Sequence, residues 1–581
     1  MKKYVSLILA AAILLCVAAG CGRSQNSAEE PTSTTVKSTP AQETAAVNEA
    51  ETSASSAEDT AELTVEGVSE VALPLVDEDT SLSFWLPYPF FVGNMIEDMS
   101  EDVSVLAELQ KRTGITFDIT AINGEAEEEQ FNLMIASESY CDVITDMSKY
   151  ARGYDAAVED GIILNLEDLV KEYAPNYWYY LNQDIDTLAT LYTDGGNLPT
   201  IATLYKSAGA ENAGYVIRKD WLDALNMDVP KTYNEFEAYV EACNSTYDTQ
   251  GIYFNSTGLD GLFAFGFDCG AGSMTGPTGG LSYRVVDGTV EASYQTDAFR
   301  AYLEQAATWY EKGLIYRDFY LYGMDDTEDQ MFCSGQLAAN IGRCTSYDLF
   351  NSYTDAGYSA VYAPMNPVKL HAEDEIHYSG TTGSLIKKQD TWSITETCEQ
   401  PELVMELVNY LFSEEGQLLF NWGVEGEAYT LNADGEPEYT DMMINDPDNP
   451  YLFTAYLYAS NTASEYAPSV MDVSKQYYSF DDTAWAAYEM YLDDGADGSY
   501  NYPDGAVLTA DELTESAPIS SDVETYVDTQ ILSFVTGQTA LTDESWDAFQ
   551  KQLSDMGIVR VVELKQAAYD RYADKLESLG A

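Results

Sequence analysis

Apolar positions between residues 81 and 144 alternate between strand-like runs and the three-to-four-residue spacing of helices. Five segments follow the order strand, helix, strand, helix, strand: residues 81–86, 103–112, 115–122, 131–135 and 142–144. Gly114 supplies the stop after the first helix, because glycine readily takes the left-handed conformation that ends helices. This order predicts an open, parallel α/β sheet, and such sheets bind ligands at the carboxyl ends of their strands. We therefore expect functional residues directly after positions 86 and 144.

A second α/β pattern begins with a strand at residues 215–218. It leads into a helix at residues 221–226, for which Asp220 is the predicted N-cap. Thr232 and Glu235 have the spacing of a capping box, so another helix is predicted to begin there. The chain thus holds at least two α/β units.

Three later signals extend this second pattern. Asp287 followed by Gly288 lies between β-branched residues and predicts a hairpin with a type I′ turn. Pro401 stands where helices tolerate proline and opens an apolar helix. Residues 542–556 carry apolar side chains on one helical face, and Gly557 ends that helix. Together these patterns predict an α/β fold for the chain.

The first twenty-one residues have the pattern of an export signal. Two lysines precede an apolar run at residues 7–17, which is too short to span a membrane comfortably. Three small residues then lead directly to Cys21, an order that resembles a bacterial lipobox, in which the cysteine is acylated. We predict a lipoprotein signal peptide over residues 1–21; an ordinary secretion signal cut near Gly20 is the alternative. The predicted location is the extracytoplasmic face of the cell membrane.

Residues 22–75 begin with a long stretch of Ser, Thr, Ala and Glu that has almost no large apolar side chains. Such a segment buries too little apolar surface to offset the entropy of ordering. We therefore predict a disordered tether between the acylated cysteine and the folded body.

The composition excludes some classes of partner. The chain has 581 residues, enough for two or three domains, and 45% of them are apolar. Its formal net charge of −71 argues against nucleic acid, because so acidic a chain cannot neutralise phosphates. The negative charge of the chain also repels an anionic membrane surface, so membrane attachment has to come from a lipid anchor or an inserted segment.

Patterns of catalytic or metal-binding residues are few. The chain has only two histidines, His371 and His377. Few histidines are therefore available as the general base that a catalytic serine or cysteine needs. No phosphate-binding or dinucleotide-binding glycine motif is present. We predict a protein that is not an enzyme and holds no cofactor or metal. A glycoside hydrolase that uses paired carboxylates is the rival class.

Six cysteines follow the signal, at spacings that contain no zinc-ribbon pair: Cys141, Cys243, Cys269, Cys333, Cys344 and Cys398. An exported chain permits disulfides, and Cys333 and Cys344 are the nearest pair. Buried free thiols are an equally good interpretation, so the pairing stays open.

Short motifs occur in a characteristic order along the chain, at residues 109–115, 134–137, 141–144, 161–166, 173–176, 217–222, 334–338, 414–417, 421–427 and 569–572. Together they resemble the bacterial extracellular solute-binding proteins of family 1, in the lipoprotein branch linked to oligosaccharide importers. The resemblance covers residues 80–575. It implies a two-lobed, type II periplasmic-binding-protein-like fold with hinge-crossing strands. It also implies a monomer that hands a carbohydrate to the membrane subunits of an ABC importer.

The resemblance places the lobes by analogy: lobe one at residues 80–212 and 378–422, and lobe two at residues 213–377 and 423–581. Some relatives that bind acidic polysaccharide carry a calcium loop rich in Asp and Asn after the helix that begins here at Thr232. In this chain residues 246–253 hold a single carboxylate, whereas calcium prefers six to eight oxygen ligands. The sequence therefore does not support a calcium site.

A sugar ring packs its apolar face on aromatic side chains, and its hydroxyls need fixed donors and acceptors. Nine residues near strand ends or crossings have suitable types: Trp85, Tyr88, Asp146, Tyr150, Arg152, Arg343, Trp422, Glu425 and Tyr429. Trp85 and Tyr150 are predicted to stack on the sugar from lobe one, and Arg343 and Tyr429 to supply polar contacts from lobe two. Core packing is the alternative for each aromatic ring. We predict a neutral or weakly charged oligosaccharide rather than a uronate chain, with a peptide or another nutrient as the alternative.

Overall fold

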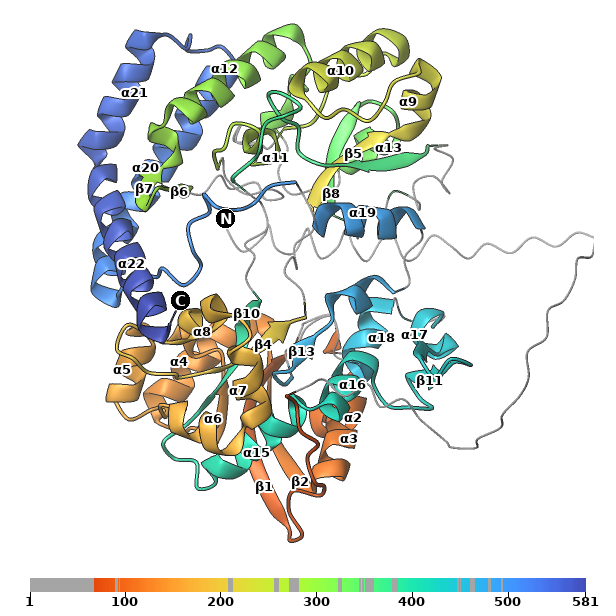
Figure 1. Ribbon diagram of the computed structural model, residues 1–581, viewed down its shortest axis with the longest axis vertical. Helices are drawn as coiled ribbons and strands as arrows, with labels where there is room; N and C mark the ends of the chain where they lie inside the picture. Colours follow the sequence, from red (N-terminus) through yellow and green to blue (C-terminus); the bar gives the residue numbers. More distant parts are fainter. Residues whose placement is uncertain are drawn as a thin grey trace, which may run out of the picture. The chain divides into compact units, whose positions relative to one another are not determined.

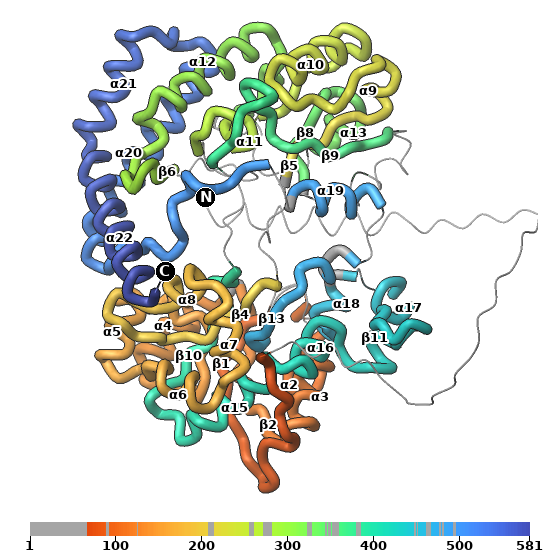
Figure 2. The backbone as a smooth tube through the Cα atoms, in the orientation of Figure 1, coloured from red at the N-terminus to blue at the C-terminus, as the bar shows by residue number. Residues whose placement is uncertain are grey.

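We describe the protein from a computed structural model (Figures 1 and 2). It describes residues 67–88, 92–93, 95–206, 213–254, 261–270, 282–321, 327–343, 346, 350, 360–378, 385–446, 449, 451–459, 466–478, 482–492 and 495–580. Over these residues, none of the helices is long and apolar enough to cross a membrane. The predicted signal peptide, Cys21 and most of the predicted tether lie outside them.

A six-stranded sheet lies at the centre of the first core. Its strands, in the spatial order β13-β4-β10-β3-β1-β2, have the bounds Val470–Met471, Ile201–Tyr205, Ile386–Ile394, Val143–Thr145, Thr80–Tyr88 and Ile115–Asn123. β1 pairs in parallel with β2 and β3, which confirms the predicted parallel arrangement. β10 runs antiparallel to both β3 and β4, and β4 pairs in parallel with β13. Five strands therefore point the same way, and their carboxyl ends lie along one edge.

Nine helices among the described residues accompany this sheet: α2 (Met99–Asp102), α3 (Ser104–Thr113), α4 (Glu127–Ser137), α5 (Gly153–Glu159), α6 (Glu167–Tyr173), α7 (Pro175–Leu181), α8 (Ile185–Leu191), α15 (Pro401–Leu411) and α16 (Glu414–Trp422). Burial of apolar side chains drives this packing. The ring of Phe84 in β1 lies 4.9 Å from Phe117 of β2 and 5.2 Å from Trp392 of β10, so one side chain joins three strands. We call this body lobe one.

A second core surrounds the antiparallel sheet β8-β5-β9, with bounds Ala339–Arg343, Ala213–Arg218 and Tyr362–Met365. The hairpin β6-β7 spans Tyr283–Val286 and Thr289–Ala292. The helices here are α9 (Lys219–Leu225), α10 (Tyr233–Tyr247), α11 (Gly261–Phe265), α12 (Asp297–Lys312), α13 (Thr327–Cys333), α19 (Asp482–Leu492), α20 (Ala510–Val535), α21 (Asp543–Met556) and α22 (Ile558–Leu579). Phe263 and Trp309 meet at 4.9 Å in this core. We call this body lobe two.

Short-range sequence signals are confirmed by the structure. Thr232 and Glu235 form both bonds of a capping box at the start of α10. Asp287 and Gly288 have φ angles of 50° and 77°, as a type I′ turn between β6 and β7 requires. Gly557, at a φ of 103°, ends α21.

The predicted N-cap of α9 is wrong. Arg218 occupies that position, and Asp220 lies in the first turn of the helix. The carboxylate of Asp220 accepts hydrogen bonds from the Arg218 guanidinium, at 2.8 Å from Nε and 2.6 Å from one terminal nitrogen. Because the carboxylate is engaged in this pair, it does not cap the backbone.

The predicted lobe boundary between residues 422 and 423 is also wrong. β13 is part of the sheet of lobe one, and Tyr456 and Tyr466 belong to its core. Val470 is the last core residue of lobe one in this stretch, and Val473 belongs to the core of lobe two. The intervening elements are β11 (Tyr429–Leu431), β12 (Pro437–Tyr439), α17 (Asp441–Ile444) and α18 (Tyr451–Tyr458). The chain therefore leaves lobe one near residue 472, about fifty residues later than predicted.

The end of the predicted tether belongs to the folded body. The backbone N–H of Ser69 donates to the Asn176 side chain at 2.8 Å, and the Asn176 amide donates back to Ser69 at 2.9 Å. The Leu75 N–H donates to the carbonyl of Thr113 at 2.8 Å. Residues 69–75 include apolar side chains that pack against the core of lobe one, so the tether ends before residue 69 rather than at residue 75.

The described cysteines are free thiols: Cys141, Cys243, Cys269, Cys333 and Cys398. Cys344 lies outside the described residues. Burial raises the pKa of Cys243 to about 12 and that of Cys333 to about 11, so both thiols stay protonated at neutral pH. Across the described part of the chain, no group of three His, Cys, Asp or Glu side chains is placed to hold a metal ion.

Candidate functional site

One edge of the six-stranded sheet gathers residues that lie far apart in the sequence. The residues that end or directly follow its five parallel strands are Tyr88, Asn123, Asp146, Lys206 and Asp472. β10 begins at the same edge, where the carbonyl of Leu385 accepts a bond from Tyr205 at 2.7 Å. Open α/β sheets bind ligands outside the carboxyl ends of their strands. We call this edge the carboxyl edge.

At the end of β3, the predicted site residue Asp146 is paired with a lysine. Asp146 is only 7% exposed, and its carboxylate accepts bonds at 2.5 Å from both Lys149 and Ser148. Lys149 also lies 2.9 Å from Glu127. Burial opposes the charge on Lys149, but its bonds to the two carboxylates raise its pKa. Both oxygens of Asp146 are therefore engaged within the protein.

Two further predicted residues, Tyr150 and Arg152, share one carboxylate. The Tyr150 hydroxyl donates to Asp160 at 2.7 Å, and the Arg152 guanidinium pairs with the same carboxylate. These bonds, first from Tyr150 and then from Arg152, lower the pKa of Asp160. The side chain of Arg152 is 60% exposed, so this cluster is accessible to a solute.

Trp85 does not have the accessible ring that its predicted stacking role requires. It is 3% exposed and meets Phe131 edge-on at 6.0 Å within a core that also contains Ile144. The inner part of β1 is buried on both faces, so no face of the strand points to solvent. Tyr88, at the end of the same strand, is half-buried and remains a candidate.

The structure brings Trp422, Glu425 and Tyr429 together between α16 and β11. Trp422 is half-buried, with the Lys475 ammonium 4.5 Å from its ring centre and the Tyr439 ring at 4.7 Å. Glu425 is exposed. Tyr429 is 4% exposed, and burial, followed by the charge of Glu425, raises the pKa of its phenol. A solute can therefore reach Trp422 and Glu425, whereas Tyr429 is a packing residue.

Of the two residues predicted to supply polar contacts from lobe two, Tyr429 lies elsewhere. Tyr429 belongs to the segment that stays with lobe one. Arg343 ends β8, where its backbone pairs with Ala213, but its side chain lies outside the described part of the structure. The contact from Arg343 therefore stays a prediction.

A lysine–carboxylate–lysine cluster at the ends of β4 and β13 was missed by the sequence analysis. Nζ of Lys206 lies 3.2 Å and Nζ of Lys475 lies 3.5 Å from the same oxygen of Asp472. Burial opposes ionisation of Asp472, but a hydrogen bond from Ser474 and the two lysines lower its pKa. Because Lys475 also lies over Trp422, the cluster connects that ring to the carboxyl edge.

A cavity of about 590 Å³ lies beside Leu385 and is lined from both lobes. Its walls are formed by Asp184, Asp186, Thr187, Thr190, Leu385, Gly498, Asn501, Tyr502, Pro503, Asp504, Tyr569, Tyr572, Ala573 and Leu576. The Tyr572 hydroxyl donates to Asp186 at 2.8 Å, which links α22 to α8 across one wall. In the sequence, residues 569–572 stand out only as one of the motifs that resemble the family.

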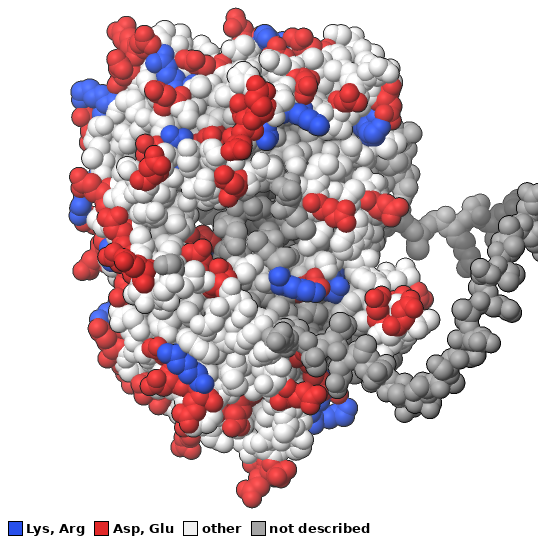
Figure 3. Space-filling view, viewed as in Figure 1, with Lys and Arg blue, Asp and Glu red and all other residues white. Residues whose placement is uncertain are grey.

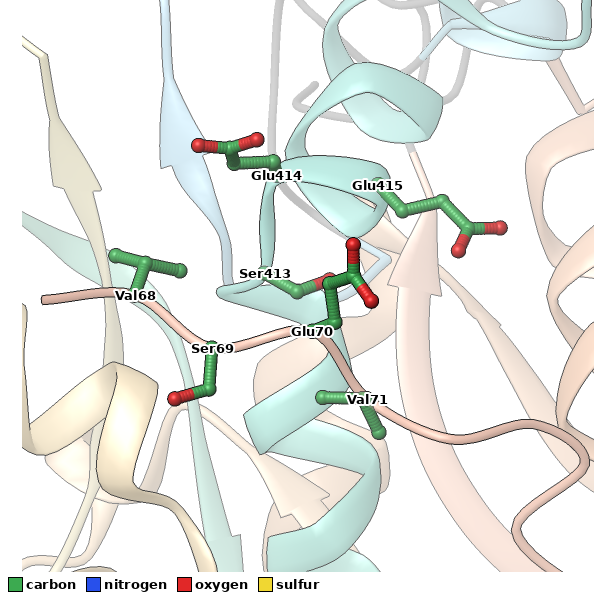
Figure 4. Close-up of a pocket in the computed structure, with 7 residues that line it drawn as sticks. All are labelled: Val68, Ser69, Glu70, Val71, Ser413, Glu414 and Glu415. Atoms are coloured by element: carbon green, nitrogen blue, oxygen red, sulfur yellow. The ribbon is translucent and has the colours of Figure 1, made fainter. Parts of the chain in front are cut away.

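A smaller cavity, of about 360 Å³, lies between residues 68–71 and the start of α16 (Figure 4). Glu70 points toward the helix, and Glu414 and Glu415 project to opposite sides of its first turn. No aromatic residue is among the described residues that line this cavity, so it offers no surface on which a sugar ring could stack. Acidic side chains are spread widely over the face of the molecule seen in Figure 3, with basic ones among them.

Comparison with known proteins shows to which family this architecture belongs. Residues 104–424, more than half of the chain, match the family described as bacterial extracellular solute-binding protein. The chain belongs to this family. The match confirms the predicted resemblance. Since the family is one of binding proteins, it also confirms that the chain is not an enzyme, and it removes the glycoside hydrolase alternative.

Individual relatives are distant. The chain is 23% identical, over 508 residues, to the fructooligosaccharide ABC transporter substrate-binding protein FusA of Streptococcus pneumoniae, which covers 81% of this chain and 87% of that protein. It is 22% identical, over 339 residues, to the polygalacturonan/rhamnogalacturonan-binding protein YtcQ of Bacillus subtilis, covering 57% and 64%. An HMO-binding, ABC-transporter-associated solute-binding protein of Bifidobacterium longum infantis matches in structure with a TM-score of 0.64. That match has 16% identity and covers 85% of this chain and 99% of the other, which confirms the predicted solute-binding-protein fold.

Proposed function

We propose that this solute-binding protein is the lipoprotein receptor of an ABC importer and that it binds an oligosaccharide between its lobes, at the carboxyl edge. The observation that carries the proposal is the pairing of Trp422, a partly accessible ring, with the fixed charges of Lys475 and Asp472. A pyranose packs its C–H face on such a ring, while its hydroxyls bond to side chains already held in place. The relative named for fructooligosaccharides supports the same ligand class.

We further propose that the oligosaccharide is neutral. Each described lysine at the carboxyl edge is paired: Lys149 with Asp146 and Glu127, and both Lys206 and Lys475 with Asp472. Each of these lysines therefore already has a carboxylate partner, which weakens its attraction for a uronate. The charge of the whole chain, −71, also repels polyanions. A uronate chain, as the name of YtcQ suggests for that relative, is the main competing ligand, and a peptide or another nutrient is a further one.

A thermal-shift screen of neutral oligosaccharides, oligogalacturonates and peptides tests both proposals. A ligand present at 100 times its dissociation constant stabilises the folded state by about 2.7 kcal/mol. We expect the melting temperature to rise with neutral oligosaccharides, and calorimetry on the same sugars to give one site per chain. A shift with oligogalacturonates alone would overturn the neutral ligand. If peptides but no carbohydrates shift the melting temperature, the carbohydrate proposal is wrong.

We also propose that Cys21 carries the lipid anchor and that the protein works at the extracytoplasmic face of the membrane. The order of charge, apolar run and small residues before Cys21 supports the anchor. The family description, an extracellular solute-binding protein, supports the location. An anchored, monomeric receptor can then deliver its solute to the membrane subunits of the importer.

A further inference from the structure

Helix α22 contacts both lobes of the protein. Near its start, Ile558 and Val561 join the core of lobe two, and the helix contacts α20 and β7. Near its end, the same helix contacts α8 of lobe one (Figure 1). A helix of 22 residues is about 33 Å long, so one continuous rod links the two bodies.

Arg571 is the main polar link at the far end of this rod. Its Nε lies 2.6 Å from the carboxylate of Asp194, in the segment after α8 of lobe one. One of its terminal nitrogens lies 2.7 Å from Glu512, in the first turn of α20 in lobe two. A single guanidinium therefore holds one carboxylate from each lobe, and its several fixed donors suit this bridging role.

Two neighbouring residues of α22 reinforce the link to lobe one. The Tyr572 hydroxyl donates to Asp186 at 2.8 Å. Nζ of Lys575 donates to the carbonyl of Tyr192 at 2.7 Å and lies 3.4 Å from Asp194. We call Arg571, Tyr572 and Lys575 the α22 junction.

The surroundings of the α22 junction leave room for movement. The fully buried apolar contact between the lobes here consists of Ala189, Ala506 and Tyr572, against which four partly exposed side chains pack: Tyr502, Tyr569, Leu576 and Leu579. The cavity of about 590 Å³ lies directly beside it and is lined by α8 and α22. Close-packed cores resist displacement, whereas a polar contact beside a cavity can separate with little loss of apolar burial.

We propose that the α22 junction stabilises the arrangement of the two lobes seen here, so that Arg571 sets solute affinity without touching the solute. A solute that bridges the lobes shifts their equilibrium only by its differential affinity for the arrangements, and the junction contributes to the same balance. The effect on affinity rests on the proposed function. The effect on lobe arrangement does not.

The distance between the lobes, measured without solute, tests the proposal. Fluorophores placed through unnatural amino acids at Gln130 and Gln552, exposed residues of α4 and α21, report that distance by energy transfer. We expect Arg571→Ala to broaden the distance distribution. Arg560→Ala is the matched control, because Arg560 lies on the same helix and its ion pairs among the described residues are with Glu515 and Glu563 of lobe two. The control should match the unsubstituted protein.

Tyr572→Phe keeps the test valid if Arg571→Ala fails to fold, since it removes one hydroxyl and keeps the ring. The proposal is overturned if both variants retain the distance distribution of the unsubstituted protein. With a solute identified by thermal shift, Arg571→Ala should change the dissociation constant by about threefold, and Arg560→Ala should not. An unchanged dissociation constant would overturn the effect on affinity. Failure of every carbohydrate to bind would count against the proposed function alone, because the distance measurement uses no solute.

Discussion

Nζ of Lys206 lies 3.2 Å from Oδ2 of Asp472, although the two residues are 266 positions apart in the sequence. They meet because β4 and β13 are neighbouring parallel strands, and the N–H of Lys206 donates to the carbonyl of Met471 at 2.9 Å. Asp472 also faces Lys475. One carboxylate therefore pairs with two lysines at the carboxyl edge, and its removal would take this partner away from both.

Asp472→Asn should change the preference of the protein among sugars. The two lysines, without this partner, would attract a uronate and lose the geometry that a neutral sugar uses. We expect the ratio of the two affinities to shift toward the uronate by roughly tenfold at low salt, and by less at high salt because salt screens exposed charges. Calorimetry with a neutral and a uronate oligosaccharide of equal length, at two salt concentrations, measures this ratio.

Asp555→Asn is the control for this experiment, because the ion-pair partner of Asp555 in the described part of the chain is Lys551, on the surface of α21. It carries the same change of charge away from the carboxyl edge. If Asp472→Asn and Asp555→Asn give the same ratio, the effect is one of net charge, and the carboxyl edge does not contact the solute.

The local structure could be predicted because its causes lie within a few residues. The capping box of Thr232 and Glu235 spans three positions, and the turn at Asp287 and Gly288 depends on two residues that tolerate positive φ. The parallel order of the first three strands followed from the alternation of apolar spacing, since helices between strands impose parallel pairing.

Two features of the candidate site could not be predicted, for physical reasons. β13 has only two residues and no periodicity, so the contact between Lys206 and Asp472 leaves no pattern in the sequence. Trp85 lies in a strand that is buried on both faces, where alternation no longer distinguishes a core ring from an accessible one. The resemblance to a family placed the fold correctly, but the side chains at the edge depend on pairings between distant segments.

The pair formed by His377 and Asp497 should make stability depend on pH near neutrality. Nδ1 of His377 lies 2.9 Å from the Asp497 carboxylate, and this hydrogen bond raises the pKa of His377 above its usual value of 6.5. Since the folded state holds the proton more tightly, the stabilisation is full below the unfolded pKa and is lost as the pH rises through the folded one. Urea unfolding at several pH values, compared with His377→Gln, should show a difference that is largest in mild acid and shrinks above neutral pH.

The partner carboxylate has the opposite dependence. A backbone bond from Ser499, and then bonds from the Ser499 and His377 side chains, lower the pKa of Asp497 to about 2. Its contribution is therefore present above the unfolded pKa and is lost as the pH falls toward about 2. A difference between the unsubstituted protein and His377→Gln that stays constant from pH 5 to pH 8 would show that the pair does not form in solution.

The lipid anchor can be tested in the cell. Cys21→Ala removes the thiol that acylation needs, so the protein should move from the membrane fraction to the soluble extracellular fraction. Fractionation and immunoblotting measure this, and metabolic labelling with a fatty-acid analogue should mark the unsubstituted protein but not Cys21→Ala. Cys398→Ala is a suitable control, because it removes a thiol from the folded body and leaves the signal intact. A cleaved Cys21→Ala protein that stays in the membrane fraction would show that another segment anchors it.

Trp85→Ala and Trp422→Ala should separate stability from binding. Trp85 is fully enclosed, so its removal leaves a cavity and should lower the free energy of unfolding by about 3–5 kcal/mol. Trp422 is half-buried under Lys475, and its removal should cost less stability. The loss of a stacking surface worth about 0.5–1.5 kcal/mol should weaken sugar binding by roughly two- to tenfold.

Urea unfolding and calorimetry on both variants measure the two effects independently. A Trp422→Phe variant keeps an aromatic ring and should recover much of the lost affinity, which a purely structural role for the side chain would not explain. Trp85→Ala, measured well below its unfolding midpoint, should bind sugar with nearly unchanged affinity because its ring lies within the core. If Trp85→Ala weakens binding at full folding while Trp422→Ala does not, the sugar lies near the end of β1 and the candidate site must be moved there.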